Sequence, residues 1–185
     1  MNKKAQKFII IGLIFIGISV LLLIYFNWEN FYSSQKSFST TKKLVKEIDT
    51  NKTNNDTIEI DGIEYIGYIS IPALKILLPV TKNFSYSSLK FAPALYYGSI
   101  TSKMVICGHS YKSHFGSLNK LQHGDKITFI DVKNKKYNYT VEEIEELAAT
   151  DIKKMLESEF DLTIYTCTKD GFKRVTVRCN KVSAN

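Results

Sequence analysis

An uncharged apolar run near the N-terminus constrains this chain more than any other feature. It reads FIIIGLIFIGISVLLLIYF and covers residues 8–26. At about 1.5 Å per residue, a helix of that length matches a hydrocarbon core about 30 Å thick. Aromatic side chains gather at its outer end, as they do at membrane interfaces; they are Tyr25, Phe26, Trp28, Phe31 and Tyr32. The run therefore predicts one transmembrane helix.

A cleaved secretory signal is the alternative interpretation of this run. Signal sequences have shorter apolar cores and small residues before the cleavage site, whereas bulky Tyr25, Phe26 and Trp28 stand here. We therefore predict an uncleaved anchor that contacts membrane lipid. Lysines precede the run, and lysines mark the cytoplasmic flank of a span. The N-terminus is expected in the cytoplasm and the rest of the chain outside the cell.

These features divide the chain into four parts. Residues 1–7 form a cytoplasmic tail and residues 8–26 the anchor. Residues 27–59 are expected to form a stalk or linker, because residues 33–59 are rich in Ser, Thr, Asn and Lys and poor in large apolar residues. One short helix is predicted within it, over Lys42–Ile48. Residues 60–185 are expected to form the folded outer domain.

The charge of the chain bears on its partners. The net charge is +7, but the basic residues are spread along the chain. Because no helix or loop collects a basic stripe with interleaved aromatics, nucleic-acid binding is not expected. A mild positive excess favours an anionic surface such as a cell wall or a membrane.

The outer domain has the pattern of a mainly β fold. Short segments rich in β-branched and aromatic residues end at Gly, Pro, Asn or Asp; they cover residues 64–71, 74–80, 103–109, 125–132, 136–144, 162–167 and 173–179. Only Tyr86–Phe91 and Asp151–Ser158 have helical character. Strands at this spacing, without long helices between them, predict a closed or nearly closed β-barrel.

Three cysteines are candidates for chemistry. Cys107 lies within an apolar strand segment, and Cys179 alternates with valines, so both are expected to be buried. Cys167 differs because it ends one strand and precedes a polar loop, where a rigid scaffold can present a reactive group. Three is an odd number, so at least one thiol stays free outside the cell.

The histidines offer one candidate. His109 follows a strand directly and has Gly108 beside it, which permits close approach of the backbone. His114 and His123 lie in loops and are interpreted as surface or structural residues. No histidine and cysteine have zinc-like spacing, and neither a metal site nor a cofactor is predicted.

Arginine occurs at only two positions, Arg174 and Arg178, although the chain has 25 Lys and Arg. If the strand ending at Cys167 forms a hairpin with the next strand, Arg174 comes near that thiol. Arg178 lies further along and is expected to form a structural ion pair or a distant substrate contact. A guanidinium can hold a developing oxyanion by hydrogen bonds in fixed geometry. Cys167, His109 and Arg174 thus suit a nucleophile, an acid/base and an anion stabiliser.

The segments that carry these residues resemble the sortase family. DLTIYTCTKDGFKRVTV is similar to the sortase cysteine signature, in which an arginine opens the strand after a TLxTC-type end. VICGHS resembles the family's histidine segment, and YIGYISIPALKILLPV resembles the first strands of its barrel.

This resemblance implies an eight-stranded β-barrel and a cysteine transpeptidase of Gram-positive cell surfaces. Such enzymes cleave secreted proteins at an LPxTG-like sorting signal, through a thioester, and join them to an amine of the cell wall or of another protein. Cys167 matches the nucleophile, His109 the general acid/base and Arg174 the residue that steadies substrate and oxyanion. Three further positions are assigned to substrate binding by the same resemblance: Thr166, Ile164 and Ser110.

The chain also departs from the family pattern. Ile164 stands where the signature has Leu. The segment TKNFSYSSLKF carries Lys82 and Lys90 in place of carboxylates, so calcium dependence is not expected. No second hydrophobic span and no Asp-Pro-aromatic lid motif occur, which argues against the pilus-polymerising class and leaves the class otherwise open.

Two other functions use the same residues. A surface cysteine protease would release its product to water in place of an amine. A membrane-anchored binding module would keep Cys167 as a structural residue only.

Overall fold

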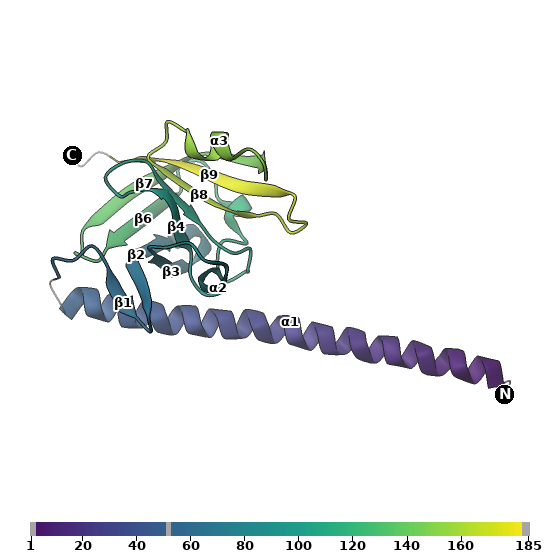
Figure 1. The fold of residues 1–185 in the computed structure, drawn as a ribbon. Helices are drawn as coiled ribbons and strands as arrows, with labels where there is room; N and C mark the ends of the chain where they lie inside the picture. Colours follow the sequence, from purple (N-terminus) through teal and green to yellow (C-terminus); the bar gives the residue numbers. More distant parts are fainter. Residues whose placement is uncertain (1–2, 51–52, 183–185) are drawn as a thin grey trace.

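One long helix and one β-barrel make up the protein (Figure 1). The computed structural model describes residues 3–50 and 53–182. Small parts of the predicted tail, stalk and outer domain lie outside the described residues, namely residues 1–2, 51–52 and 183–185. Helix α1 covers Lys3–Thr50, and the barrel lies against its C-terminal half, so that the N-terminal half projects away from the barrel (Figure 1).

Helix α1 differs from the sequence expectation for residues 33–59. The short helix predicted over Lys42–Ile48 is the end of a continuous helix that begins at Lys3 and includes the apolar run. Of the helices in the described part of the chain, α1 is the one long and apolar enough to cross a membrane. The apolar run therefore continues without a break into the segment that contacts the barrel.

A stripe of small and apolar residues on α1 faces the barrel. Its members recur at intervals of three or four residues, which places them on one helix face. These buried residues are Ser33, Ser37, Thr40, Thr41, Leu44 and Ile48. Leu44 and Ile48 form a cluster with Tyr65 and Ala92 of the barrel. Burial of this stripe stabilises a helix that the polar composition of the segment does not suggest.

In the part of the chain that the structure describes, nine strands form one continuous sheet. They are β1 (Ile58–Ile60), β2 (Ile63–Ile71), β3 (Ile76–Thr81), β4 (Ala94–Gly98), β5 (Met104–Cys107), β6 (Lys126–Asp131), β7 (Lys136–Ala148), β8 (Leu162–Cys167) and β9 (Lys173–Lys181). Their order is β1-β2-β3-β4-β5-β8-β9-β7-β6, and β2 also pairs with β6. That pairing closes strands β2 to β9 into the eight-stranded barrel, which confirms the predicted fold. Strand β1 is added at its edge.

Short helices fill the connections between strands. They are the α-helices α2 (Tyr86–Leu89) and α3 (Ile152–Leu156) and the 3-10 helices η1 (Pro72–Leu74) and η2 (Leu118–Lys120). Helices α2 and α3 lie within the two segments predicted to be helical. The sequence prediction missed β1 and β4, because β1 is very short and β4 has only one β-branched or aromatic pair, Tyr96 and Tyr97.

Strand β9 is buried on both faces. Val175, Val177 and Cys179 point into the barrel core, as their alternation predicts. On the opposite face, Thr176 and Arg178 are 0% and 2% exposed. The covering element is α3, since the Arg178 guanidinium donates to the carbonyl oxygens of its C-terminal residues.

Arg178 forms a structural ion pair, one of the two roles expected for it. Its Nε lies 2.9 Å from Glu145 Oε1. Its Nη1 donates to Thr163 Oγ1 at 2.9 Å and to the Met155 carbonyl at 3.2 Å, and its Nη2 donates to the Lys154 carbonyl at 2.7 Å. The planar guanidinium of Arg178 thus connects β7, β8 and α3.

We expect Arg178→Lys to lower the free energy of unfolding by roughly 2–4 kcal/mol. A lysine keeps the charge but cannot reach all four acceptors, so buried polar groups lose their partners. Urea denaturation of the detergent-solubilised chain would measure the loss. Lys82→Arg is a matched control, because the pair of Lys82 with Glu64 is exposed and should change stability by less than about 0.5 kcal/mol. An Arg178→Lys variant as stable as this control would contradict the role.

Candidate active site

Three neighbouring strands lead to the predicted catalytic residues. In the sheet, β8 lies between β5 and β9. Cys167 of β8 pairs directly with Arg174 of β9, which confirms the predicted proximity of these two residues. On the other side, β5 runs parallel to β8 with Cys107 opposite Tyr165. His109 follows the end of β5 by two residues, and Cys167 is the last residue of β8, two residues after Tyr165. The register therefore brings the loop that carries His109 to the end of β8.

The loop after β5 is held firmly at this point. The Gly108 N–H donates to the Tyr165 carbonyl at 3.0 Å, and the Thr166 hydroxyl donates to the Gly108 carbonyl at 2.9 Å. A side chain at Gly108 would not fit, because its Cβ would lie 2.5 Å from the Phe115 ring. These contacts fix the backbone from which His109 projects.

The three cysteines have different environments. Burial raises the pKa of the Cys107 thiol to about 12, and it raises the pKa of the Cys179 thiol as well. Both therefore stay protonated at neutral pH. Cys167 is exposed at the end of β8. Among the cysteines, it alone can meet a substrate in solution, and only a thiol of that kind can act as a nucleophile.

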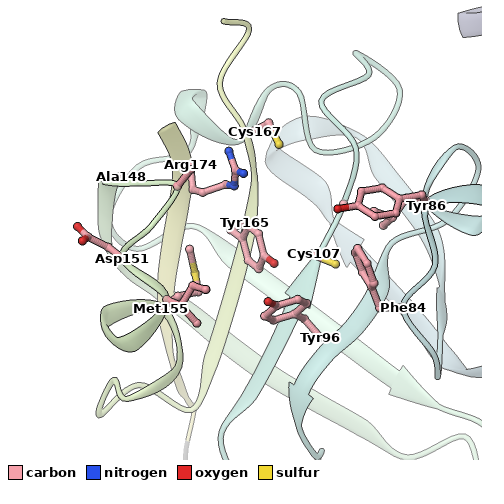
Figure 2. Close-up of a pocket in the computed structure, with 14 residues that line it drawn as sticks. Phe84, Tyr86, Tyr96, Cys107, Ala148, Asp151, Met155, Tyr165, Cys167 and Arg174 are labelled. Carbon is pink, nitrogen blue, oxygen red and sulfur yellow. The ribbon is translucent and has the colours of Figure 1, made fainter. Parts of the chain in front are cut away.

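Arg174 is oriented by the turn between β8 and β9. Its Nη1 donates to the carbonyl oxygens of Gly171 at 3.1 Å and Lys173 at 3.0 Å. Figure 2 shows its guanidinium directed toward the end of β8 that carries Cys167. One nitrogen is thus used to hold the side chain, which leaves other N–H groups to donate to a substrate oxygen.

An aromatic cleft of about 250 Å³ opens on one side of Cys167 (Figure 2). Four of its rings form a chain of edge-to-face contacts with centroid separations of 5.2, 5.8 and 5.7 Å; in order along the chain they are Tyr86, Phe84, Tyr96 and Tyr165. Helix α3 and the end of β7 form the opposite wall, and Arg174 lies at the rim. Such a cleft suits an apolar peptide segment.

A second, more polar cleft of about 550 Å³ also includes Cys167 in its lining. It lies between the loop of residues 110–120 and the start of the β8–β9 turn. Ser110, Lys112, Thr168 and Lys169 contribute polar side chains to its lining. Cys167 therefore stands where two clefts of different character meet.

The three residues assigned to substrate binding lie in different places. Ser110 and Thr166 line the polar cleft, although the buried Thr166 hydroxyl is already used by Gly108. Ile164 is fully buried in the main core and lines neither cleft. Within the described residues, no group of three or more His, Cys, Asp or Glu side chains could hold a metal ion.

The His109 ring is half-buried and stacked on Tyr111. The ring centroids are 3.9 Å apart and the planes differ by 11°. Burial lowers the pKa of His109, the nearby Glu29 carboxylate opposes that shift, and Lys90 adds to it. Neither Tyr111 nor Glu29 was predicted from the sequence as a site residue. Tyr111 lies two residues after His109, and this short separation could have marked it as a neighbour. No sequence feature predicts that Glu29 of α1 approaches this loop.

His114 is buried completely beside the same tyrosine. Its ring meets Tyr111 edge-on with centroids 5.7 Å apart, and neither ring nitrogen has a hydrogen-bond partner among the described residues. Burial lowers its pKa to about 4. His114, which was interpreted as a surface or structural residue, is thus a buried structural residue near the site. His123, which had the same interpretation, is exposed, with 75% of its side chain accessible.

We expect His114 to make the fold sensitive to acid. Above a pH of about 6.5 the histidine is neutral in the folded and unfolded chains, and its full contribution to stability is present. Between pH 6.5 and 4 the unfolded chain takes up a proton that the folded chain does not, so up to about 3 kcal/mol is lost. Thermal unfolding from pH 7 to 4 should show a smaller loss in His114→Phe than in the wild type. His123→Gln should behave as the wild type, and equal slopes for all three would contradict the assignment.

Comparisons with known proteins agree with this fold. A family model of the sortase domain matches residues 69–182. Sortase A of Bacillus anthracis is 26% identical over 203 residues, which covers 96% of this chain and 95% of that protein. Among solved structures, sortase C1 of Streptococcus agalactiae has a TM-score of 0.60 at 25% identity and covers 82% of this chain and 90% of its own. Sortase C of Clostridium perfringens, solved with the C-terminal cell wall sorting motif, has a TM-score of 0.58 at 22% identity, with coverage of 79% and 91%.

Proposed function

The chain belongs to the sortase family, a family of cysteine transpeptidases, and from this premise we propose that it cleaves an LPxTG-like sorting signal and transfers the cleaved protein to an amine. The observation that carries the proposal is the pairing of Cys167 with Arg174 at the ends of β8 and β9, beside the loop after β5 that carries His109, with Cys167 at the meeting point of two clefts. Secreted proteins with such a signal are the proposed substrates, and a cell-wall peptide or another protein supplies the amine.

The chemistry consists of two acyl transfers. The Cys167 sulfur attacks the carbonyl carbon of the scissile peptide bond, and Arg174 donates hydrogen bonds to the oxyanion that develops. The carbon–nitrogen bond breaks as His109 gives a proton to the leaving amine, which leaves a thioester on Cys167. An acceptor amine then attacks the thioester, His109 takes its proton, and the thiolate is released.

The two clefts suit the two substrates. The aromatic cleft offers apolar surface for the leucine and proline of a sorting signal. The polar cleft lies on the other side of Cys167 and gives an amine acceptor a separate path to the thioester. Thr166 acts indirectly, because its hydroxyl holds the Gly108 carbonyl next to His109.

The long apolar part of α1 is the proposed membrane anchor. With the lysines at its N-terminal flank in the cytoplasm, the barrel lies outside the cell. This placement brings the site to the side of the membrane on which secreted proteins emerge.

A product assay tests the proposal. The full chain in detergent is mixed with an LPxTG-containing peptide, with and without a millimolar amine such as triglycine, and the products are identified by mass spectrometry. We expect a new peptide in which the amine replaces the leaving group. Hydrolysed peptide alone, in the presence of the amine, would favour a protease. Intact peptide in both samples would overturn the assignment as an enzyme for this signal.

A further inference from the structure

The membrane helix reaches the candidate active site through one acidic residue. Glu29 of α1 lies 3.1 Å from Lys90 Nζ, just after helix α2. The Glu29 carboxylate also neighbours the Tyr111 side chain, and, after the larger effect of Lys90, their interaction lowers the pKa of Glu29. Tyr111 is the residue stacked on His109. A continuous set of contacts thus runs from α1 to the proposed acid/base.

From these contacts we propose that Glu29 is a positioning residue for His109. It holds the Tyr111 hydroxyl, and the Tyr111 ring holds the imidazole by stacking. The proposal rests on the proposed function only in taking His109 as the acid/base of the reaction. Glu29 itself touches neither substrate nor the reacting atoms.

Further observations support the interaction between Glu29 and the loop that carries Tyr111. Ser33, one helix turn beyond Glu29, donates its hydroxyl to the Lys90 carbonyl, and Lys36 Nζ lies 3.8 Å from the centroid of the Phe91 ring. The segment after α2 is therefore held along α1 on successive turns. Hydrogen bonding to Lys90 lowers the pKa of Glu29, so the carboxylate is ionised at neutral pH. Burial raises the pKa of Tyr111, so its hydroxyl remains a donor.

Glu29 lies on α1 close to the end of the proposed membrane span. Glu29 follows the end of the proposed span, Phe26, by three residues, or about 4.5 Å along a helix axis. His109 is thus tied to a part of α1 that lies at the membrane surface. A barrel detached from α1 would lose the carboxylate that fixes Tyr111 and, through it, the imidazole.

Kinetics of the full chain in nanodiscs test the positioning role. We expect Glu29→Gln to lower kcat roughly tenfold with little change in KM, because a misplaced acid/base slows chemistry without weakening substrate binding. Tyr111→Phe keeps the ring but loses the hydroxyl, and should lose a similar factor. The double variant should be no slower than either single variant, since both break one connection. Asp49→Asn makes the same change of charge on α1, about 30 Å away at 1.5 Å per residue, and should leave kcat unchanged.

An NMR titration of the His109 ring gives a readout that does not require turnover. Four titratable groups from three parts of the chain neighbour this ring: Glu29 on α1, Lys90 after α2, and Tyr111 and His114 in the loop after β5. The Glu29 carboxylate favours the imidazolium, so Glu29→Gln should lower the pKa of His109, whereas Asp49→Asn should not. The His109 resonance is identified by its loss in His109→Gln.

The outcomes are separable. An unchanged His109 pKa in Glu29→Gln, or additive losses of rate in the double variant, would overturn the positioning role. Absence of turnover by the wild type would overturn the proposed function instead, while the titration would still decide whether Glu29 acts on His109.

Discussion

Cys167→Ala is expected to abolish both cleavage of a sorting peptide and transfer to an amine, while the barrel stays folded. The thiol is exposed where β8 ends, so its removal leaves no cavity in the core and no buried group without a partner. The reaction, in contrast, loses the atom that forms the thioester. A rate assay with a fluorogenic sorting peptide, together with circular dichroism of the same sample, would show both results.

The other two cysteines provide matched controls for this substitution. Cys107 and Cys179 are 3% and 0% exposed, so replacement by alanine removes packed atoms from the interior. We expect each variant to lose about 1–3 kcal/mol of stability and to keep its activity at temperatures where it remains folded. Substantial turnover by Cys167→Ala would contradict the assignment of the nucleophile, and loss of activity in folded Cys179→Ala would show that the wrong thiol had been chosen.

Arg174→Lys is expected to lose roughly 10²–10³ in rate, the scale of one oxyanion-hole donor. Arg174 stands directly opposite Cys167 in the β8–β9 pair. Its fork can be held by the turn carbonyls of Gly171 and Lys173 and still donate to an oxyanion. An ammonium lacks this fixed fork, because its three donors radiate from one atom. The loss should fall mainly on kcat, since the oxyanion exists only after attack.

Arg178→Lys is the matched control for Arg174→Lys. Arg178 pairs with Thr163, four residues before Cys167 on β8, and its guanidinium is committed to Glu145 and α3. Arg178→Lys should therefore chiefly lower the stability of the fold. It should lower the rate at most about tenfold, because α3, which forms one wall of the aromatic cleft, becomes less firmly held. Purified variants assayed with one fluorogenic peptide would decide between the two arginines. If Arg178→Lys is the slower enzyme, their roles must be exchanged.

The barrel could be predicted because its determinants are local. Alternation of apolar and polar residues along β8 and β9 sets which side chains face the core. The short turn between them sets the register that places Arg174 beside Cys167. Gly108 marked a close approach of backbone and side chain, and the Phe115 ring occupies that space. Each of these conclusions depends on residues within a few positions of one another.

The docking of α1 could not be predicted in the same way. Its contact face consists largely of serines and threonines, such as Ser33, Ser37 and Thr40, and an apolar periodicity does not detect small polar residues. Burial of such a face depends on the shape of the barrel, which the helix sequence does not contain. The same long-range contact brings Glu29 to Tyr111, so this part of the site was also missed.

Ile164 and Thr166 show a different limit. A family signature marks positions without saying what each side chain contacts. Ile164 packs in the main core, and the Thr166 hydroxyl is bonded to Gly108. Both therefore support the strand that carries Cys167. Ser110 is half-buried in the lining of the polar cleft, where its side chain can meet a substrate.

The most direct measurement of the central claim is intact-mass spectrometry of the full chain mixed with a sorting peptide and no acceptor amine. We predict a mass increase equal to the N-terminal fragment of the peptide, located at Cys167 by digestion and removed by hydroxylamine, as a thioester requires. Cys167→Ala should show no such increase. Cleaved peptide without an adduct on Cys167, or an adduct on any other residue, would contradict a covalent mechanism through this thiol.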